Sequence, residues 1–392
     1  MSSALPKSAS VVIVGGGMQG LSCAINLALL GIRDIVVLDA GYWQGGTSGR
    51  NGCLIRPGFG GHDWTRLFEL SWREWTTLSR KLGHNVMFTE RGYTMIAETG
   101  QSAEMLRNAS QLHRQYGITS KILTHRQISR LLPAINQEYV TAALHQPRGG
   151  MAPHHSVMKG YLHACREKGI DVRYRTAITG FDMHDRSVRG VYVNDHLIRS
   201  GTVVIAAGPQ SPELARYAGV EIDGYMMRIE AMALEPMRPL IGPALALIDS
   251  LAYFHQTARG EVVGGTEVHE TPQKNLRADV PAMAAMAHVY TRLFPQLADI
   301  RILRQWAGLL HISSDLAPLL GPHPRVRDLW FSAGWSYGFA GAPGAGLLMA
   351  KAIAKGQVDE IMRPFALDRI EKGNPIEEAG VVMNKKGIYI PA

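Results

Sequence analysis

One segment near the N-terminus constrains the fold of this chain more than any other. The apolar, β-branched run Val11–Val14 leads directly into Gly15-Gly16-Gly17-Met18-Gln19-Gly20, and apolar residues then recur at helical spacing up to Gly31. A second apolar run, Ile35–Leu38, follows and ends at an acidic residue, Asp39. This order of strand, glycine-rich turn, helix and strand predicts a βαβ unit.

The glycines of this turn have the spacing G-x-G-x-x-G, at Gly15, Gly17 and Gly20. Glycine there permits a tight turn, lets the backbone approach a pyrophosphate and lets the helix pack closely on the strand. The helix N-terminus then offers free N–H groups and a positive dipole end to the phosphates. Asp39 ends the second strand, where a carboxylate can bind a ribose hydroxyl pair. The alternative is a turn without a nucleotide, but the three features together favour a dinucleotide site.

A second glycine-rich loop near the C-terminus bears on which dinucleotide is bound. It runs from Gly334 to Gly346 and leads into a helix that we expect from about Pro343 to Lys355, with the proline in its first turn. A helix N-terminus aimed at a flavin ring would stabilise the negative charge of the reduced ring. NAD-dependent enzymes need no such second site, so the loop favours FAD. The alternative is an ordinary loop-to-helix junction.

The composition is that of a folded globular protein, with 46% hydrophobic and 19% charged residues among 392. Cys23, Cys53 and Cys165 are far apart and form no C-x-x-C pair, so we expect no metal or iron–sulfur site and a reducing, cytoplasmic compartment. No stretch reaches the roughly 18 apolar residues that cross a bilayer, so no membrane association is expected. The net charge of +8 fits either a solvated basic surface or attraction of anionic ligands. The basic residues are spread along the chain without a Lys/Arg run, which argues against nucleic-acid binding.

The sequence resembles the flavoprotein family that contains D-amino acid oxidase, glycine oxidase and sarcosine oxidase. Within this family it is most similar to the beta subunits of heterotetrameric sarcosine oxidases and to the related beta subunits of opine oxidases and amino-acid dehydrogenases. The resemblance covers nearly the whole chain. The matching segments include Thr47–Asn51, Asn85–Phe88, Arg91-Gly92, Arg148–Gly150, Ala206–Gly208, Leu303–Trp306, Asp315, Pro318, Gly321, Gly334-Trp335, Pro343-Gly344 and Leu367–Arg369.

The resemblance implies an α/β fold in which a Rossmann-like FAD-binding domain is interleaved with a substrate domain built on a mixed, largely antiparallel sheet. We expect the FAD-binding domain at residues 1–87, 146–216 and 312–369, the substrate domain at 88–145 and 217–311, and a C-terminal tail at 370–392. FAD is expected to be bound non-covalently. The expected FAD-binding positions are Gly15, Gly17, Gly20, Asp39, Thr47, Ser48, Arg50, Asn51, Gly208, Gly334, Gly338, Phe339 and Pro343.

The resemblance to the heterotetrameric enzymes also implies partner chains, an alpha subunit and smaller subunits. In those enzymes an FMN lies at the interface with the alpha subunit and is attached to a histidine of the beta subunit. This histidine aligns with His154, and the placement is ambiguous by one residue because His155 is adjacent. The alternative is that both histidines are exposed polar residues before a helix.

The family's reaction implies oxidation of a small secondary amine or amino acid (sarcosine-, opine- or proline-like) to an imine by hydride transfer to the flavin. The protein would orient the substrate, bind its carboxylate and polarise the ring. Candidate groups on the substrate-domain strands are Arg228, Glu230, Tyr253, His255, Gln256, Arg304 and Trp306. Among these we expect Tyr253, Arg304 and Trp306 to take part in the reaction, although each can instead be a packing residue.

The chain departs from the family at Ala340, where sarcosine oxidases carry a lysine thought to promote the reaction with oxygen. A lysine ammonium would stabilise the negative charge that develops when oxygen takes an electron, and alanine supplies no charge. We therefore expect a dehydrogenase rather than an oxidase. Two alternatives remain: a stand-alone enzyme like glycine oxidase or D-amino acid oxidase, and a nucleotide-binding protein that acts on nucleic acid.

Overall fold

The structure is a computed structural model that describes residues 4–266 and 275–378. The expected βαβ unit is present and consists of β2 (Val11–Val14), α1 (Met18–Leu29) and β3 (Ile35–Leu38). β2 and β3 are parallel neighbours, with Val11 opposite Ile35 and Val14 opposite Leu38. The part of the predicted C-terminal tail after residue 378 lies outside the described residues.

Two glycines of the first turn are required by the close approach of the backbone. Gly15 has a φ of +118°, and a Cβ there would lie 2.3 Å from the carbonyl oxygen of Ala206. A Cβ on Gly20 would lie 2.0 Å from the carbonyl oxygen of Gly15. Gly15 therefore permits the turn, and Gly20 permits α1 to pack against it.

The βαβ unit belongs to a six-stranded sheet with the order β19-β20-β13-β2-β3-β9. The pairs in this sheet are parallel except for β19 with β20. The further strands are β9 (Asp171–Arg173), β13 (Val203–Ile205), β19 (Leu319–Pro322) and β20 (Leu329–Ala333). Because the carboxyl ends of parallel strands meet at one edge, the turns after β2, β3, β13 and β20 gather there.

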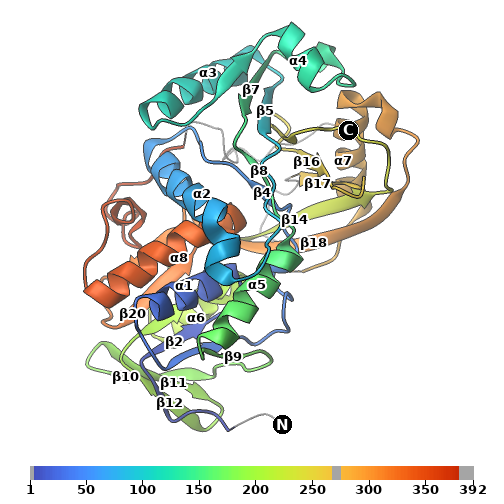
Figure 1. The fold of residues 1–392 in the computed structure, drawn as a ribbon. Coiled ribbons are helices and arrows are strands. Elements are labelled where there is room, and N and C mark those ends of the chain that lie inside the picture. The colour runs from blue at the N-terminus through green and yellow to red at the C-terminus, as the bar shows by residue number, and fades with distance from the viewer. Residues whose placement is uncertain (1–3, 267–274, 379–392) are drawn as a thin grey trace.

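Both faces of this sheet are covered (Figure 1). Val11 and Ile13 share a core with the helices α1, α2 (His62–Leu82), α5 (His154–Glu167) and α8 (Gly338–Lys355). Val12 and Val14 face the opposite side and share a core with a smaller sheet, β1-β12-β11-β10, and with α6. Burial on both faces explains why β2 is a continuous apolar run. The bounds are β1 (Ser8–Ala9), β10 (Gly180–His184), β11 (Ser187–Val193), β12 (His196–Ser200) and α6 (Ser211–Tyr217).

The second large sheet has eight strands in the order β18-β14-β17-β16-β15-β5-β7-β6. Among its described pairs only β15 with β5 is parallel, so the sheet is mixed and largely antiparallel. The expected fold class is therefore confirmed. The strands are β5 (Tyr93–Ala97), β6 (Lys121–Leu123), β7 (Ala142–Gln146), β14 (Tyr225–Leu234), β15 (Ala244–Leu247), β16 (Tyr253–Gln256), β17 (Val262–Thr266) and β18 (Ile302–Ile312).

Helices of the upper part in Figure 1 cover this sheet. α7 (Val280–Leu293) shares a core with β14, β16 and β17, while α3 (Gly100–Gln115) shares one with β5 and β7. The remaining elements are α4 (His125–Leu131) and a short antiparallel pair, β4 (Leu54–Ile55) with β8 (Gly150–Met151). The two large sheets draw on alternating stretches of the chain, and we propose the domain boundaries given above on that basis.

The last helix differs from its prediction. α8 begins at Gly338 rather than near Pro343, so the proline lies inside the helix and not in its first turn. Glycines lower helix propensity, which is why this segment reads as a loop. Here they permit close packing instead: a Cβ on Gly341 would lie 2.5 Å from the Trp335 ring, and one on Gly346 would lie 2.2 Å from Ser22 Oγ.

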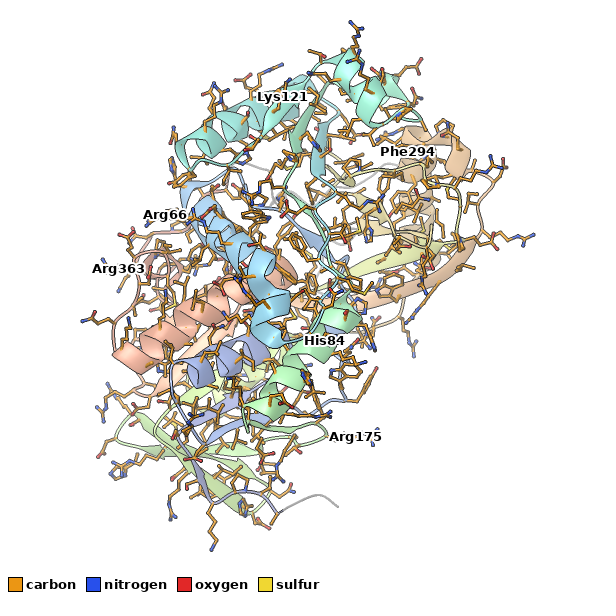
Figure 2. All side chains as sticks on the ribbon, viewed as in Figure 1. Arg66, His84, Lys121, Arg175, Phe294 and Arg363 are labelled. Atoms are coloured by element: carbon orange, nitrogen blue, oxygen red, sulfur yellow. The ribbon has the colours of Figure 1, made fainter. Side chains whose placement is uncertain are left out.

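The surface agrees with a dispersed basic charge. Lys121, Arg175 and Arg363 are exposed and lie at separate places around the molecule (Figure 2). None of the helices within the described ranges is long and apolar enough to cross a membrane. Residues 4–266 and 275–378 also contain no cluster of three or more His, Cys, Asp or Glu side chains that could hold a metal ion.

Candidate functional site

The first glycine-rich turn is tied to the acidic residue that ends β3. Asp39 Oδ2 accepts a hydrogen bond from Gly16 N–H at 2.7 Å, and Oδ1 accepts one from Gly41 N–H at 2.7 Å. Tyr174 closes the same turn from the other side, since its hydroxyl donates to the Gly16 carbonyl at 2.9 Å. A carboxylate has lone pairs beyond these two bonds, so Asp39 can still accept hydroxyl groups of a ribose.

The loop that follows β3 lies across the start of α1. Ser48 Oγ accepts a hydrogen bond at 3.0 Å from Met18 N–H. This N–H belongs to the first helical turn and therefore has no hydrogen-bond partner within the helix. Thr47 Oγ1 donates to the Leu309 carbonyl at 2.7 Å, and Asn51 Nδ2 donates to the Ser48 carbonyl at 2.6 Å. The Arg50 guanidinium donates to the Gly45 carbonyl within the loop. These bonds place a hydroxyl group beside the helix N-terminus where a phosphate is expected.

The second glycine-rich loop meets the first through Gln19. The Gln19 side chain donates to the Gly338 carbonyl at 2.7 Å and accepts from Ser332 Oγ at 3.0 Å. Ser332 Oγ in turn accepts from Trp335 Nε1 at 3.1 Å. Gln19 therefore joins the start of α1 to the start of α8, a role that sequence reasoning missed because Gln19 occupies a variable position of the glycine motif.

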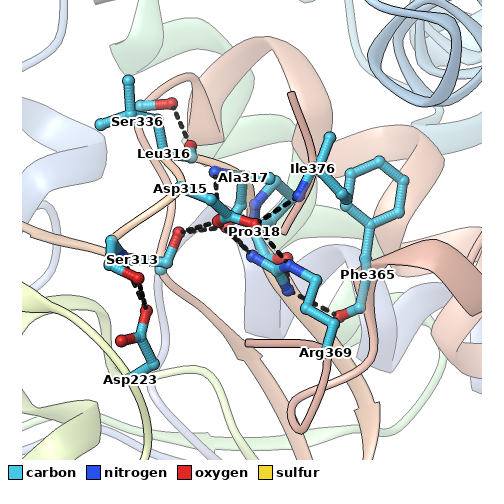
Figure 3. Close-up of polar contacts among 12 residues, drawn as sticks. Asp223, Ser313, Asp315, Leu316, Ala317, Pro318, Ser336, Phe365, Arg369 and Ile376 are labelled. Carbon is cyan, nitrogen blue, oxygen red and sulfur yellow. Dashed lines mark hydrogen bonds and ion pairs between the residues drawn. The ribbon is translucent and has the colours of Figure 1, made fainter. Parts of the chain in front are cut away.

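A buried network supports the second loop from behind (Figure 3). Ser336 Oγ donates to the Leu316 carbonyl at 3.0 Å, and the segment around Leu316 is held by Asp315. The Asp315 carboxylate binds Arg369 through two bonds, of 2.7 Å from Nε and 2.6 Å from an Nη atom. Hydrogen bonds from Arg369 lower the pKa of Asp315, although burial opposes them. The C-terminal segment thus fixes the loop before α8.

His311 also anchors this loop. Its Nδ1 accepts a hydrogen bond from Gly334 N–H at 3.1 Å, and its Nε2 donates to the Asp223 carbonyl at 3.0 Å. Burial lowers the pKa of His311 to about 4, so the neutral ring with its proton on Nε2 persists at neutral pH. Sequence reasoning missed His311, which is recognisable only once β18 and the Gly334 turn are known to meet.

These segments surround a cavity of about 680 Å³. Its lining contains most of the predicted FAD-binding residues: Gly15, Gly17, Asp39, Thr47, Ser48, Arg50, Asn51, Gly208, Gly334, Gly338 and Phe339. Gly20 and Pro343 lie outside the lining. Gly20 serves helix packing instead, and Pro343 lies beyond the first turn of α8 because the helix begins at Gly338.

The far wall of the cavity is formed by the eight-stranded sheet. Tyr253, on β16, lines the cavity, and its ring lies 2.2 Å from where a Cβ on Gly52 would be. The Tyr253 hydroxyl oxygen lies 2.9 Å from where a Cβ on Gly265 would be. Glycines at both places leave room for this side chain between the loop and the sheet.

A buried arginine that follows β4 was not among the predicted site residues. Arg56 lines the cavity, is 3% exposed and directs its guanidinium at the rings of Phe59, Tyr93 and Tyr337, at 4.0, 5.2 and 5.3 Å from their centroids. A cation stacked among aromatic rings beside a cavity offers N–H donors to a carboxylate. The available signal was an arginine directly after the apolar pair Leu54–Ile55.

Of the other predicted catalytic residues, Ala340 lines the cavity, whereas Arg304 and Trp306 do not. Ala340 lines the cavity and is 4% exposed. Arg304 is exposed on β18 with its guanidinium 5.5 Å from the Trp306 ring, and neither residue lines the cavity. Trp306 is half-buried and donates from Nε1 to the Arg50 carbonyl at 3.0 Å.

The remaining substrate-domain candidates also lie outside the lining. Arg228 is buried and forms ion pairs with Glu230 at 3.2 Å and Asp279 at 2.5 Å. Gln256 is buried and accepts from Leu240 N–H at 2.7 Å, and burial lowers the pKa of His255 to about 4. These contacts fit the packing roles that were their alternatives.

His154 begins α5 at the edge of the site. Its Nδ1 lies 3.3 Å from Cys53 Sγ, whereas His155 is exposed, with its ring 5.0 Å from that of Trp43. Burial, His155 and Arg304 all lower the pKa of His154. Burial raises the pKa of Cys53 to about 12, so the thiol stays protonated. His154 itself is not part of the cavity lining, but Cys53 is.

Comparison with known proteins agrees with this geometry. Residues 10–352 match the family described as FAD dependent oxidoreductase. The chain belongs to this family. It is 30% identical to the sarcosine oxidase subunit beta of Arthrobacter sp over 383 residues, which cover 95% of this chain and 94% of the relative.

Solved structures share the fold of this chain. L-proline dehydrogenase from P.horikoshii superposes with a TM-score of 0.90 at 25% identity, covering 94% of this chain and 99% of that one. Glycine oxidase from Geobacillus kaustophilus superposes with a TM-score of 0.83 at 21% identity, covering 92% and 98%. The family match over residues 10–352 confirms the expected family and, with it, FAD as the cofactor.

The residues present fit FAD. Among the described residues, only Ser48 has atoms within 4 Å of where a Cβ on Gly17 would be, so the start of α1 opens onto the cavity. The N–H groups of this turn that remain beyond those of Gly16 and Met18 would hold the pyrophosphate of this FAD dependent oxidoreductase, and Asp39 would bind the ribose. The loops after β3 and before α8 would enclose the rest of the cofactor.

Proposed function

We propose that this FAD dependent oxidoreductase converts a small secondary amine or amino acid, such as a sarcosine-, opine- or proline-like compound, to an imine. One observation carries the proposal: a single cavity is lined by the dinucleotide turn, by the buried Arg56 that follows β4, and by Tyr253 of the eight-stranded sheet. The relatives support it, because the sarcosine, proline and glycine in their names each combine an amine with a carboxylate. When bound, FAD accepts the hydride that leaves the substrate carbon.

The protein's own contribution is positioning. Arg56 would bind the substrate carboxylate through its guanidinium, and the buried setting strengthens that ion pair. Tyr253, at the start of β16, also lines the cavity and would bound the space left for the amine. The amine nitrogen releases its proton to water as the C–N double bond forms, so the reaction asks for no dedicated base. Apolar walls keep other water out.

Substitution of Arg56 tests this proposal. Arg56→Met should raise KM for a carboxylated amine at least 100-fold, because a buried charge-assisted pair is lost. Arg56→Lys keeps the charge but not the bidentate hydrogen-bond geometry, and it should raise KM less than Arg56→Met does. An amine lacking the carboxylate should be oxidised equally poorly by wild type and both variants. Equal KM values for the carboxylated amine would contradict the assignment.

We propose further that the chain acts as the beta subunit of a hetero-oligomer in the cytoplasm, with an alpha subunit and smaller subunits. The proposal is supported by the Arthrobacter relative, whose name is that of one subunit and whose length this chain matches. Mass measurement of natively purified material tests it. An active homomer that carries FAD alone would favour the stand-alone amino-acid oxidase instead.

We also propose an FMN at the partner interface, linked to His154. In support, His154 rather than His155 adjoins Cys53 of the cavity lining, and its lowered pKa keeps the imidazole neutral and nucleophilic. Denaturing electrophoresis of the complex should then show flavin fluorescence on this chain. His154→Asn should remove the fluorescence while FAD is retained, and His155→Asn should keep both. Fluorescence that survives His154→Asn would exclude this linkage.

A further inference from the structure

The start of α8 has an unusual set of hydrogen bonds next to its internal proline. Pro343 has no N–H, and its ring crowds the carbonyl of the preceding turn, which weakens a helix at this point. Gly344 N–H donates to Ser71 Oγ at 3.1 Å, and the Ser71 hydroxyl donates to the Ala340 carbonyl at 2.6 Å. The hydroxyl of Ser71 thus connects the N–H and the C=O that a regular α-helix joins directly.

A second donor from the same helix reaches the same carbonyl. Trp75 Nε1 donates to the Ala340 carbonyl at 2.9 Å. Ser71 and Trp75 lie one turn apart on α2 and are buried, at 0% and 1% exposure. A Cβ on Gly344 would lie 2.7 Å from Ser71 Cα, so glycine is what allows α2 to approach so closely.

We infer that Ser71 and Trp75 are positioning residues that hold the first turn of α8 against the cofactor cavity. Gly338, Phe339 and Ala340 of this turn line the cavity, whereas Ser71 and Trp75 do not. The two α2 side chains therefore act through α8. Because a helix N-terminus stabilises nearby negative charge, the placement of this turn sets how strongly it favours reduced, negatively charged FAD. The inference rests on the proposed binding of FAD in this cavity.

The two residues should behave non-additively. Ser71→Ala and Trp75→Phe each leave the Ala340 carbonyl with one of its two α2 donors. The double variant removes both and leaves a buried carbonyl and the Gly344 N–H less well paired. We expect the double variant to bind FAD roughly tenfold more weakly, more than the two single effects combined. The reduction potential of its bound FAD should become more negative.

The chain offers matched controls for both substitutions. Ser22 is a buried serine of α1 that packs against α8 at Gly346, beyond the proline. Trp72 is a buried tryptophan of α2 whose Nε1 donates to the Arg148 carbonyl at 2.8 Å rather than to α8. Ser22→Ala and Trp72→Phe should lower the melting temperature without moving the potential or the FAD affinity.

The experiment measures the melting temperature, the FAD dissociation constant and the flavin reduction potential of the FAD-loaded chain with any partners that copurify. A double variant that melts earlier but keeps the wild-type potential and affinity would show a merely structural role and overturn the inference. If the double variant does not fold, the inference is tested on the single variants, whose flavin potential and FAD affinity are compared with those of Ser22→Ala and Trp72→Phe. A wild-type chain that binds no FAD would instead refute the proposed function, and the inference with it.

Discussion

Gly17→Val is expected to weaken FAD binding strongly while the fold is kept. Gly17 has φ −83° and ψ −174°, which is extended backbone open to any residue, and a Cβ there would meet Ser48 Oγ at 3.0 Å. Valine fits this backbone, but its methyl groups would occupy the space beside the first N–H groups of α1. Two charge-assisted bonds to the pyrophosphate, at about 1.5–3 kcal/mol each, would be lost. FAD binding should weaken by roughly two to four powers of ten.

Titration of the deflavinated chain with FAD measures this loss, and thermal unfolding reports on the fold. Gly20→Ala and Gly15→Ala are the contrasting variants, because their Cβ atoms would lie 2.0 and 2.3 Å from backbone oxygens. They should lower the melting temperature strongly. Gly100→Ala, with no atom near its Cβ, should change neither quantity. A Gly17→Val chain that keeps its full complement of FAD would refute the assignment of the phosphate site.

Three further outcomes are expected. Arg369→Met leaves the buried Asp315 carboxylate without its partner and should lower the free energy of unfolding, measured in urea, by about 3–5 kcal/mol. Arg325→Met, which breaks the exposed ion pair with Glu371, should lower it by less than about 1 kcal/mol. The pKa of His311 falls from 6.5 to about 4 on folding, so the unfolded chain binds the extra proton and stability is lost as the pH falls through this window. The loss should be smaller in His311→Asn, and equal slopes of stability against pH would contradict this. Ala340→Lys should speed reoxidation of the reduced enzyme by oxygen in stopped-flow mixing, because an ammonium stabilises developing negative charge. Rapid reoxidation of the wild-type enzyme with release of hydrogen peroxide would contradict the expectation that the protein is a dehydrogenase.

The βαβ unit and the cofactor turn were predictable because their signals are local. A strand, a turn and a helix within one short segment each leave a pattern in the sequence, and backbone N–H groups bind phosphate whatever the side chains are. The second loop was also visible through its glycines. Its helix start was misplaced, because the close packing of Gly341 and Gly346 that compensates their low helix propensity depends on distant parts of the chain.

The substrate wall was predictable only in part. Tyr253 was found because it lies on a strand of the expected substrate domain, and Arg304 and Trp306 were chosen by the same reasoning. Strand membership does not specify which face or which end of a strand meets the cavity. On β18 the exposed end carries Arg304, whereas the buried end carries His311, which binds the Gly334 turn. Register between distant strands decides this, and a single sequence does not encode it locally.

Three departures from local rules gather around the cavity. Cys53 has a φ of +63°, which is uncommon for a residue with a side chain, and Arg56 is a buried cation. Pro343 lies within a helix whose first turn lines the same cavity. Each feature lowers stability unless neighbouring groups compensate, as Ser71 does beside the proline. Such departures are expected where function, rather than folding, determines the residue. These three departures therefore support the reaction site that we propose in this cavity, and they do so independently of the glycine motif.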